Sequence, residues 1–94
     1  MYGLIGKMAA VNGQRDALAR ILAEGTREMP GCLSYVIALD EADANALWIT
    51  EVWQSKELHM ASLQLPQVQA AIKAGRPLIA SFVSRTETTP VAGI

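Results

Sequence analysis

The residue types best suited to chemistry are concentrated in one stretch of the chain, residues 47–59. This stretch contains both tryptophans, the only histidine, and Glu51 within an apolar run. Histidine has an ordinary pKa near neutrality, so His59 is a candidate general base. A carboxylate in an apolar strand must be paired or protonated. Glu51 is therefore an ion-pair partner of Arg85 or Arg76, a contact between subunits, or a proton acceptor with a raised pKa.

Two aromatic residues, Trp53 and Tyr35, are candidates for holding a flat substrate or for filling the core. Trp53 alternates in phase with Glu51, so it either lines a cavity as a stacking surface or packs as ordinary core. Tyr35 either hydrogen-bonds an oxygen of such a substrate or is a half-buried strand residue. Trp48 falls on the opposite face of the same strand, which favours a place in an interface between two copies.

Composition excludes several classes of function. One His and one Cys cannot supply a metal site of the usual ligand number, and dinucleotide, Walker A and nucleophile-elbow motifs are absent. We therefore expect no metal and no cofactor. A net charge of -1 gives no basic surface for nucleic acid. Apolar runs fall short of the roughly 20 residues of a membrane span. The lone Cys32 and the lack of a basic leader predict a cytoplasmic protein.

The hydrophobic content predicts an oligomer. Of the 94 residues 51% are hydrophobic, which is more apolar surface than so small an interior can hide. An exposed apolar sheet face promotes aggregation unless a second copy covers it. We therefore expect a homodimer.

The elements that must position these residues follow from alternation and helical spacing. Strands are predicted over residues 2–10, 32–39, 46–53 and 78 to about 87. Helices are predicted over residues 13 to about 28, 55 to about 64, and from Pro66 to Gly75. Ser55 is a suitable N-cap and Pro66 suits a first helical position. The order β-α-β-β-α-β predicts one domain, residues 1–94, with a ferredoxin-like α+β fold: a four-stranded antiparallel sheet with helices on one face.

Several motifs together resemble the antibiotic biosynthesis monooxygenase family of dimeric α/β barrels. The segments that carry the resemblance are residues 51–57 (EVWQSKE), Gly13 after the first strand, residues 29–32 (MPGC), Leu65-Pro66, and residues 76–79 (RPLI). Known members oxygenate anthrones or quinols with O2 and no cofactor, and relatives degrade haem. Many members have a His nine residues after the Trp, a position held here by Ser62, whereas His59 follows Trp53 by six. The first strand lacks the Asn of the haem-degrading relatives, which argues against haem breakdown.

The resemblance implies a cofactor-independent monooxygenase that acts on a phenolic, quinol or anthrone-like aromatic with O2. His59 and Glu51 are then the catalytic candidates, and Trp53, Tyr35 and Ser62 the substrate-binding ones. Two alternatives remain open: a non-enzymatic dimer that binds a small ligand or serves a stress response, and a lactone or keto-enol isomerase on the same scaffold.

Overall fold

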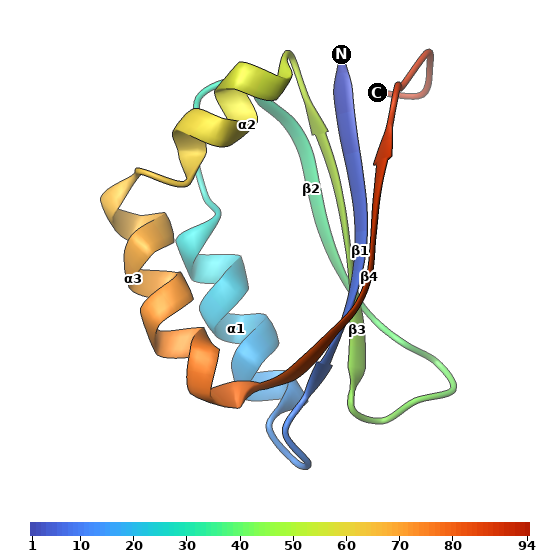
Figure 1. Ribbon diagram of the computed structural model, residues 1–94, viewed down its shortest axis with the longest axis vertical. Coiled ribbons are helices and arrows are strands. Elements are labelled where there is room, and N and C mark those ends of the chain that lie inside the picture. The colour runs from blue at the N-terminus through green and yellow to red at the C-terminus, as the bar shows by residue number, and fades with distance from the viewer.

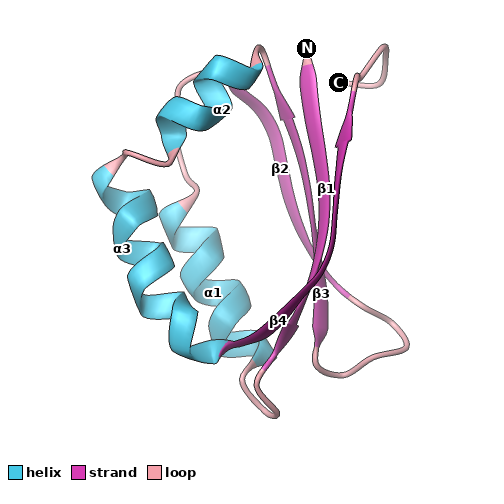
Figure 2. Ribbon diagram, in the orientation of Figure 1, coloured by secondary structure: helices cyan, strands magenta, loops and turns pink.

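The computed structural model describes residues 1–94 as one sheet covered on one face by helices (Figure 1). The elements in chain order are β1 (Tyr2–Ala10), α1 (Arg15–Gly25), β2 (Cys32–Leu39), β3 (Ala46–Trp53), α2 (Lys56–Ser62), α3 (Pro66–Gly75), the short 3-10 helix η1 (Arg76–Leu78) and β4 (Ile79–Thr88). All three helices lie on the same side of the sheet (Figure 2). This arrangement confirms the predicted ferredoxin-like fold.

The sheet is antiparallel throughout, in the order β2-β3-β1-β4. The central strands β1 and β3 pair from Tyr2 opposite Trp53 to Ala9 opposite Ala46. Because side chains alternate between faces, this register places Tyr2, Leu4, Gly6 and Met8 on the helix-covered face. The same face receives Trp53, Glu51 and Ile49 from β3.

The first helix is shorter than predicted. It spans Arg15–Gly25 rather than residues 13 to about 28, and no side chain caps its start. Gly13 has φ 81° and Glu28 has φ 53°, left-handed values that no α-helical residue adopts. The other end signals are confirmed: Ser55 caps α2 by accepting the Leu58 N–H at 3.2 Å, and α3 begins at Pro66.

The core beneath the helices is divided into two clusters. One cluster, at the end of the sheet that bears the N-terminus, consists of Tyr2, Leu4, Met29, Trp53 and Val68. The other consists of Ala10, Leu18, Leu47 and Ile49. Tyr35 packs against both clusters and so lies at the boundary between them. Between the clusters β1 contributes Gly6, which has no side chain to fill the space.

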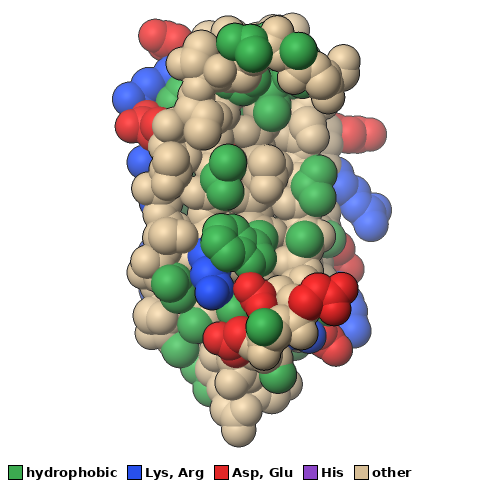
Figure 3. Space-filling model, turned by 90° about the vertical axis from the view of Figure 1, so that its right-hand side faces the viewer, with side chains coloured by type: hydrophobic (Ala, Val, Ile, Leu, Met, Phe, Trp, Pro, Cys, Tyr) green, Lys and Arg blue, Asp and Glu red, His purple; other side chains and the backbone are tan.

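The opposite face of the sheet carries no helix. Hydrophobic side chains are spread along it, and charged side chains gather at its lower end and flanks (Figure 3). Ile5 and Val36 are 38% and 51% exposed there. Only 16 of the 94 residues are buried in the single chain, so most of the hydrophobic composition is not hidden by its own fold.

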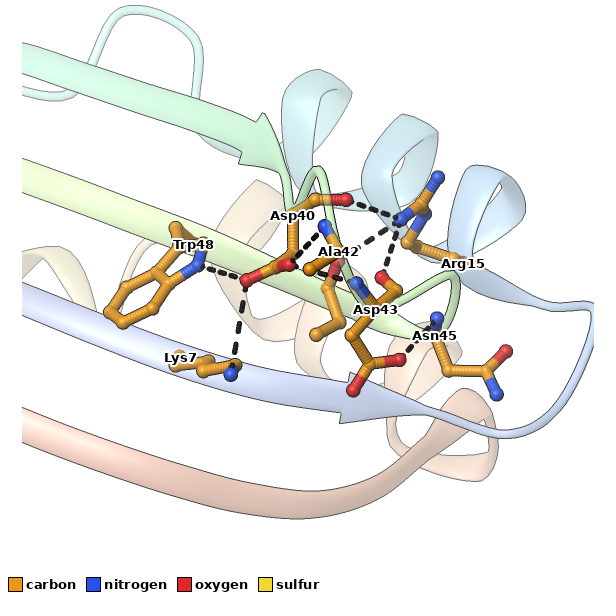
Figure 4. Close-up of polar contacts among 8 residues, drawn as sticks. Lys7, Arg15, Asp40, Ala42, Asp43, Asn45 and Trp48 are labelled. Carbon is orange, nitrogen blue, oxygen red and sulfur yellow. Dashed lines mark hydrogen bonds and ion pairs between the residues drawn. The ribbon is translucent and has the colours of Figure 1, made fainter.

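The connection from β2 to β3 is a polar turn built around one carboxylate (Figure 4). Asp40 accepts hydrogen bonds from the Ala42 N–H at 2.8 Å, the Asp43 N–H at 2.9 Å and the Trp48 indole N–H at 2.8 Å. Arg15 of α1 donates to the carbonyl oxygen of Asp43 at 2.9 Å and so connects the helix to the turn.

None of the helices is long and apolar enough to cross a membrane.

Candidate functional site

The chain enters the candidate site through the junction of β3 and α2. Trp53 ends the strand, Ser55 caps the helix, and the first helical turn brings His59 back over the end of the sheet. His59 is 7% exposed and Trp53 is fully buried. A hydrogen bond from the Ser62 hydroxyl to the His59 carbonyl oxygen, 2.6 Å long, fixes the helix one turn further on.

Glu51, Trp53 and His59 form one contact group. The Trp53 indole Nε1 donates to Glu51 Oε1 at 3.0 Å, and His59 Nε2 lies 3.8 Å from the same oxygen. The His59 ring meets the Trp53 ring edge-on, with centroids 5.4 Å apart. His59 Nδ1 is buried and has no hydrogen-bond partner. One hydrogen-bond donor, the Trp53 indole, and one nitrogen of the His59 ring therefore face the same oxygen of a half-buried carboxylate.

Burial shifts the pKa values of Glu51 and His59 in the directions that favour their neutral forms. It raises the pKa of the Glu51 carboxyl above its ordinary value, and the Trp53 N–H and the nearby charge of Arg85 offset only part of that effect. Burial lowers the pKa of His59, and Arg85 lowers it further. A carboxylate with a raised pKa beside an uncharged imidazole is a suitable proton acceptor near neutral pH.

A second polar group lies beside the first and was missed by the sequence analysis. The Tyr2 hydroxyl donates to Glu87 Oε2 at 2.7 Å, and Lys56 Nζ approaches the same oxygen at 3.1 Å. The Tyr2 ring lies 5.6 Å from the His59 ring, measured between centroids. Tyr2 shares the alternation of the buried Leu4, and this phase was the only signal in the sequence; its partner is 85 residues away.

A pocket of about 290 Å³ lies between the sheet and α1, at the boundary between the two core clusters. Its walls are mainly apolar, with polar groups from β1, β2, β3 and β4. The residues that line it are Leu4, Gly6, Lys7, Met8, Leu22, Tyr35, Ile49, Glu51, Phe82, Ser84 and Arg85. Ligand sites are commonly pockets of this type, apolar with a few convergent polar groups.

The structure divides the predicted site residues into two sets. Glu51 and Tyr35 line the pocket. Trp53 and His59 lie behind Glu51 and contact it, while Ser62 is directed at the His59 backbone. Trp53 is thus a support for the carboxylate rather than a wall of the pocket. Arg85, named from the sequence as an ion-pair partner of Glu51, lines the pocket beside it but forms no close ion pair with it; the basic side chain closest to Glu51 is His59, whose Nε2 lies 3.8 Å from the carboxylate.

Tyr35 is poised to act as a hydrogen-bond donor. Burial, with the nearby Glu51 as a second cause, raises the pKa of its hydroxyl, so the phenol stays protonated at any physiological pH.

No group of three or more His, Cys, Asp or Glu side chains in the chain is arranged to hold a metal ion.

Solved structures of other proteins share this fold over nearly the whole chain. A Chloroflexus aurantiacus J-10-fl protein classed with the antibiotic biosynthesis monooxygenases is 63% identical, with a TM-score of 0.97 over 99% of this chain and 95% of its own. A Deinococcus radiodurans protein of the same class is 26% identical, with a TM-score of 0.79 over 100% and 96%. Rv0793 from Mycobacterium tuberculosis, at 22% identity and a TM-score of 0.80 over 98% and 96%, shares the fold alone.

Comparison at the level of sequence points to the same class. No curated protein matches the sequence significantly. The family model described as antibiotic biosynthesis monooxygenase matches residues 1–74, which include β1, β3 and all three helices except the last residue of α3. The chain therefore belongs to the antibiotic biosynthesis monooxygenase family.

Proposed function

We propose that this protein is a cofactor-independent monooxygenase that oxidises a small phenolic or quinol-type aromatic with O2. The observation that carries the proposal is the position of Glu51. Its carboxyl group lines an apolar pocket, has a raised pKa, and is contacted on its other side by Trp53 and His59. Oxygenation without a cofactor needs an electron-rich anion of the substrate and a base to form it. Glu51 is the one carboxylate of the pocket, so we assign it the role of base.

The reaction balances with substrate and O2 alone. Glu51 accepts the phenolic proton, and the phenolate gives one electron to O2, after which the radical pair joins to form a C–O bond at an unsubstituted ring carbon. Glu51 returns its proton to the peroxide anion. Loss of the C–H proton with cleavage of the O–O bond then releases water and leaves a quinone carbonyl. One oxygen atom enters the product, the other leaves as water, and the substrate supplies all four electrons.

The neighbouring side chains would act on the base and on the substrate. The Tyr35 hydroxyl would donate a hydrogen bond to a substrate oxygen, since it lines the same pocket and stays protonated. His59 would act on Glu51 from behind, because its Nε2 lies 3.8 Å from the carboxylate but the ring does not line the pocket. Ser62 would hold the His59 backbone.

The first experiment is oxygen uptake by the EDTA-treated protein with anthrone, dihydroxynaphthalenes and simple hydroquinones. We expect uptake above the autoxidation rate, reduced by about a hundredfold in Glu51→Gln, at the lower end of the range typical of general-base catalysis. The reduction should be smaller, about tenfold, in His59→Ala, because His59 acts only through Glu51. Asp40→Asn is the matched control, because Asp40 also accepts an indole N–H but lies outside the pocket. Uptake equal to the blank, or unchanged in Glu51→Gln, would contradict the proposal.

An isomerase is the second candidate, because a carboxylate base and a phenol donor in one pocket also suffice for enolisation without O2. Proton–deuterium exchange into a keto-enol substrate under anaerobic conditions, lost in Glu51→Gln, would favour it. A protein that binds such ligands but shows neither reaction would be the non-enzymatic binding dimer.

We further propose that the protein is a homodimer assembled through the uncovered face of the sheet. The exposed Ile5 and Val36, with Trp48 beside them, give that face an apolar surface that a second copy would cover. Light scattering at micromolar concentration should give twice the chain mass, falling to the monomer value in Val36→Glu. A wild-type protein of monomer mass would refute this assembly.

A further inference from the structure

Two groups of opposite charge line the same pocket without forming an ion pair with each other. Glu51 comes from β3 and Arg85 from the edge strand β4. The ion pairs of the structure are Lys7–Asp40 and Lys56–Glu87, and the basic side chain closest to Glu51 is His59, so Arg85 takes part in none of these contacts. Arg85 is near enough to Glu51 to lower its pKa. A guanidinium is thus available to an anion at the rim of an apolar pocket.

The other cation of the pocket is already engaged. Lys7 Nζ lies 3.8 Å from Asp40 Oδ2 and 5.3 Å from the centroid of the Trp48 ring. This ammonium is held towards the uncovered face of the sheet by its two partners. Arg85 is therefore the cation of the pocket that forms no close ion pair, although its charge also lowers the pKa values of Glu51 and Glu87 and it lies near the Tyr2 hydroxyl.

The register opposite Arg85 leaves room for a ligand. Arg85 pairs with Gly6 of β1, which in turn pairs with Ile49 of β3. A Cβ atom built on Gly6 would meet only the Ser84 carbonyl oxygen, at 3.6 Å, which is an ordinary contact. Glycine is therefore not required there by packing or by a positive φ. Its effect is to keep open the space between Arg85 and the apolar floor of the pocket.

We propose that the pocket selects a hydroxylated aromatic that also carries a carboxylate, with Arg85 binding the carboxylate and Glu51 facing the hydroxyl. The planar guanidinium fits a carboxylate through two parallel hydrogen bonds. An anion placed at Glu51 instead would be repelled, which orients the ring with its hydroxyl towards the base. The ring itself lies between apolar walls that include Leu22, Ile49 and Phe82.

The size of the pocket suits a small aromatic substrate. At about 290 Å³ it lies at the lower end of the range of roughly 300–1,000 Å³ typical of ligand sites. Arg85 and Phe82 are exposed, so the carboxylate end of the ligand would stay close to solvent. This inference rests on the proposed function for the role of Glu51, but the binding of the carboxylate can be measured without turnover.

The test compares two ligands that differ only in the carboxylate, 6-hydroxy-2-naphthoate and 2-naphthol. Their affinities are measured by anaerobic calorimetry on the full chain. We expect the naphthoate to bind at least about tenfold more tightly, as a charge-assisted bidentate contact allows. In Arg85→Met this preference should disappear while naphthol binding is retained. Arg85→Lys should keep part of it, because the charge remains but the fork is lost.

Two further variants control for position. Arg76→Met removes an arginine outside the pocket and should leave the preference unchanged. Gly6→Val fills the pocket with a residue favoured in strands, and should weaken both ligands about tenfold or more. No preference in the wild type, no binding of either ligand, or a preference that survives Arg85→Met would overturn the proposal. A clear preference for the naphthoate without any oxygen uptake would contradict the monooxygenase proposal and leave the carboxylate proposal standing.

Discussion

The two tryptophans of β3 each donate an indole hydrogen bond to a carboxylate, on opposite faces of the sheet, but the pKa values of the two carboxylates are shifted in opposite directions. Trp48 donates its indole N–H to Asp40 at 2.8 Å, and Trp53 donates its own to Glu51 at 3.0 Å. The pKa of Asp40 is lowered to about 2, whereas that of Glu51 is raised. Each carboxylate also has a basic side chain 3.8 Å away, Lys7 for Asp40 and His59 for Glu51.

The difference comes from the surroundings that each carboxylate has besides the indole. Asp40 sits in a turn, where two backbone N–H groups and the ammonium of Lys7 add to the Trp48 bond and burial has little effect. Glu51 is desolvated, and the single indole donor does not restore what burial removes. One hydrogen bond therefore does not decide the charge of a carboxylate; the balance of donors and burial does. Asp40 is a structural anion, and Glu51 is suited to taking up a proton.

The largest expected effect is on the free energy of unfolding, which should fall more when the buried Trp53 is truncated than when Trp48 is. Trp53 is fully buried in the core cluster, so Trp53→Ala should lower the free energy of unfolding by about 3–5 kcal/mol. Trp48 lies on the uncovered face, so in the proposed homodimer Trp48→Ala should act mainly on association and its effect should grow on dilution. Urea unfolding at two protein concentrations measures both. A loss below about 1 kcal/mol for Trp53→Ala would mean that the cluster repacks readily.

The next effect is a stability difference of opposite sign for the two carboxylates. The folded-state pKa of Glu51 is raised, so its stabilising contribution is present at low pH and lost as the pH rises through that pKa. Glu51→Gln should therefore gain stability relative to the wild type as the pH rises from the ordinary glutamate pKa of 4.5 towards neutrality. Thermal unfolding of both proteins across this range would measure the gain. Glu57→Gln, which changes an exposed glutamate, is the control. A wild-type advantage that grows with pH would contradict the assignment.

For Asp40 the sign is reversed. Its folded-state pKa of about 2 lies below the ordinary value of 3.8, so its contribution is present at neutral pH and lost as the pH falls towards 2. Asp40→Asn should be less stable than the wild type at neutral pH, and the difference should shrink in acid. If the two proteins stay equally far apart at the lowest pH reached, the loss comes from the shape of the turn and not from the charge.

A smaller effect tests the two indole bonds directly. Trp53→Phe removes the only hydrogen-bond donor that lowers the pKa of Glu51, so that pKa should rise further. Trp48→Phe should raise the pKa of Asp40 and leave Glu51 unchanged. Carbon-13 NMR titration of the carboxyl groups follows both residues in one experiment. The comparison fails if Trp53→Phe lowers the pKa of Glu51.

The smallest expected effect concerns Lys7. Its charge is the weakest influence on Asp40, behind the Trp48 and backbone donors, so Lys7→Met should leave the pKa of Asp40 well below its ordinary range. The same NMR titration checks this. A return of Asp40 to an ordinary pKa in Lys7→Met would show that the ion pair, rather than the hydrogen bonds, keeps the carboxylate charged.

The sequence by itself determined the fold and the faces. Alternation in residues 46–53 placed Glu51 and Trp53 on one face and Trp48 on the other, and Ser55 and Pro66 marked the helix starts. These are local signals, since strand and helix periods and caps depend on neighbours within a few residues. The family resemblance was visible for the same reason, because its motifs are short and in order.

The tertiary structure alone decided which of these residues meet. Tyr2 finds Glu87 across 85 residues, and Gly6 faces Arg85 through pairing of the first and last strands. That pairing shifts register twice, between Lys7 and Met8 and between Ala9 and Ala10, so the partner of a given residue cannot be counted along the chain. The pocket sits where two core clusters fail to join, and the protonation of Glu51 depends on the resulting burial. Both are properties of packing between distant elements, for which no local pattern exists.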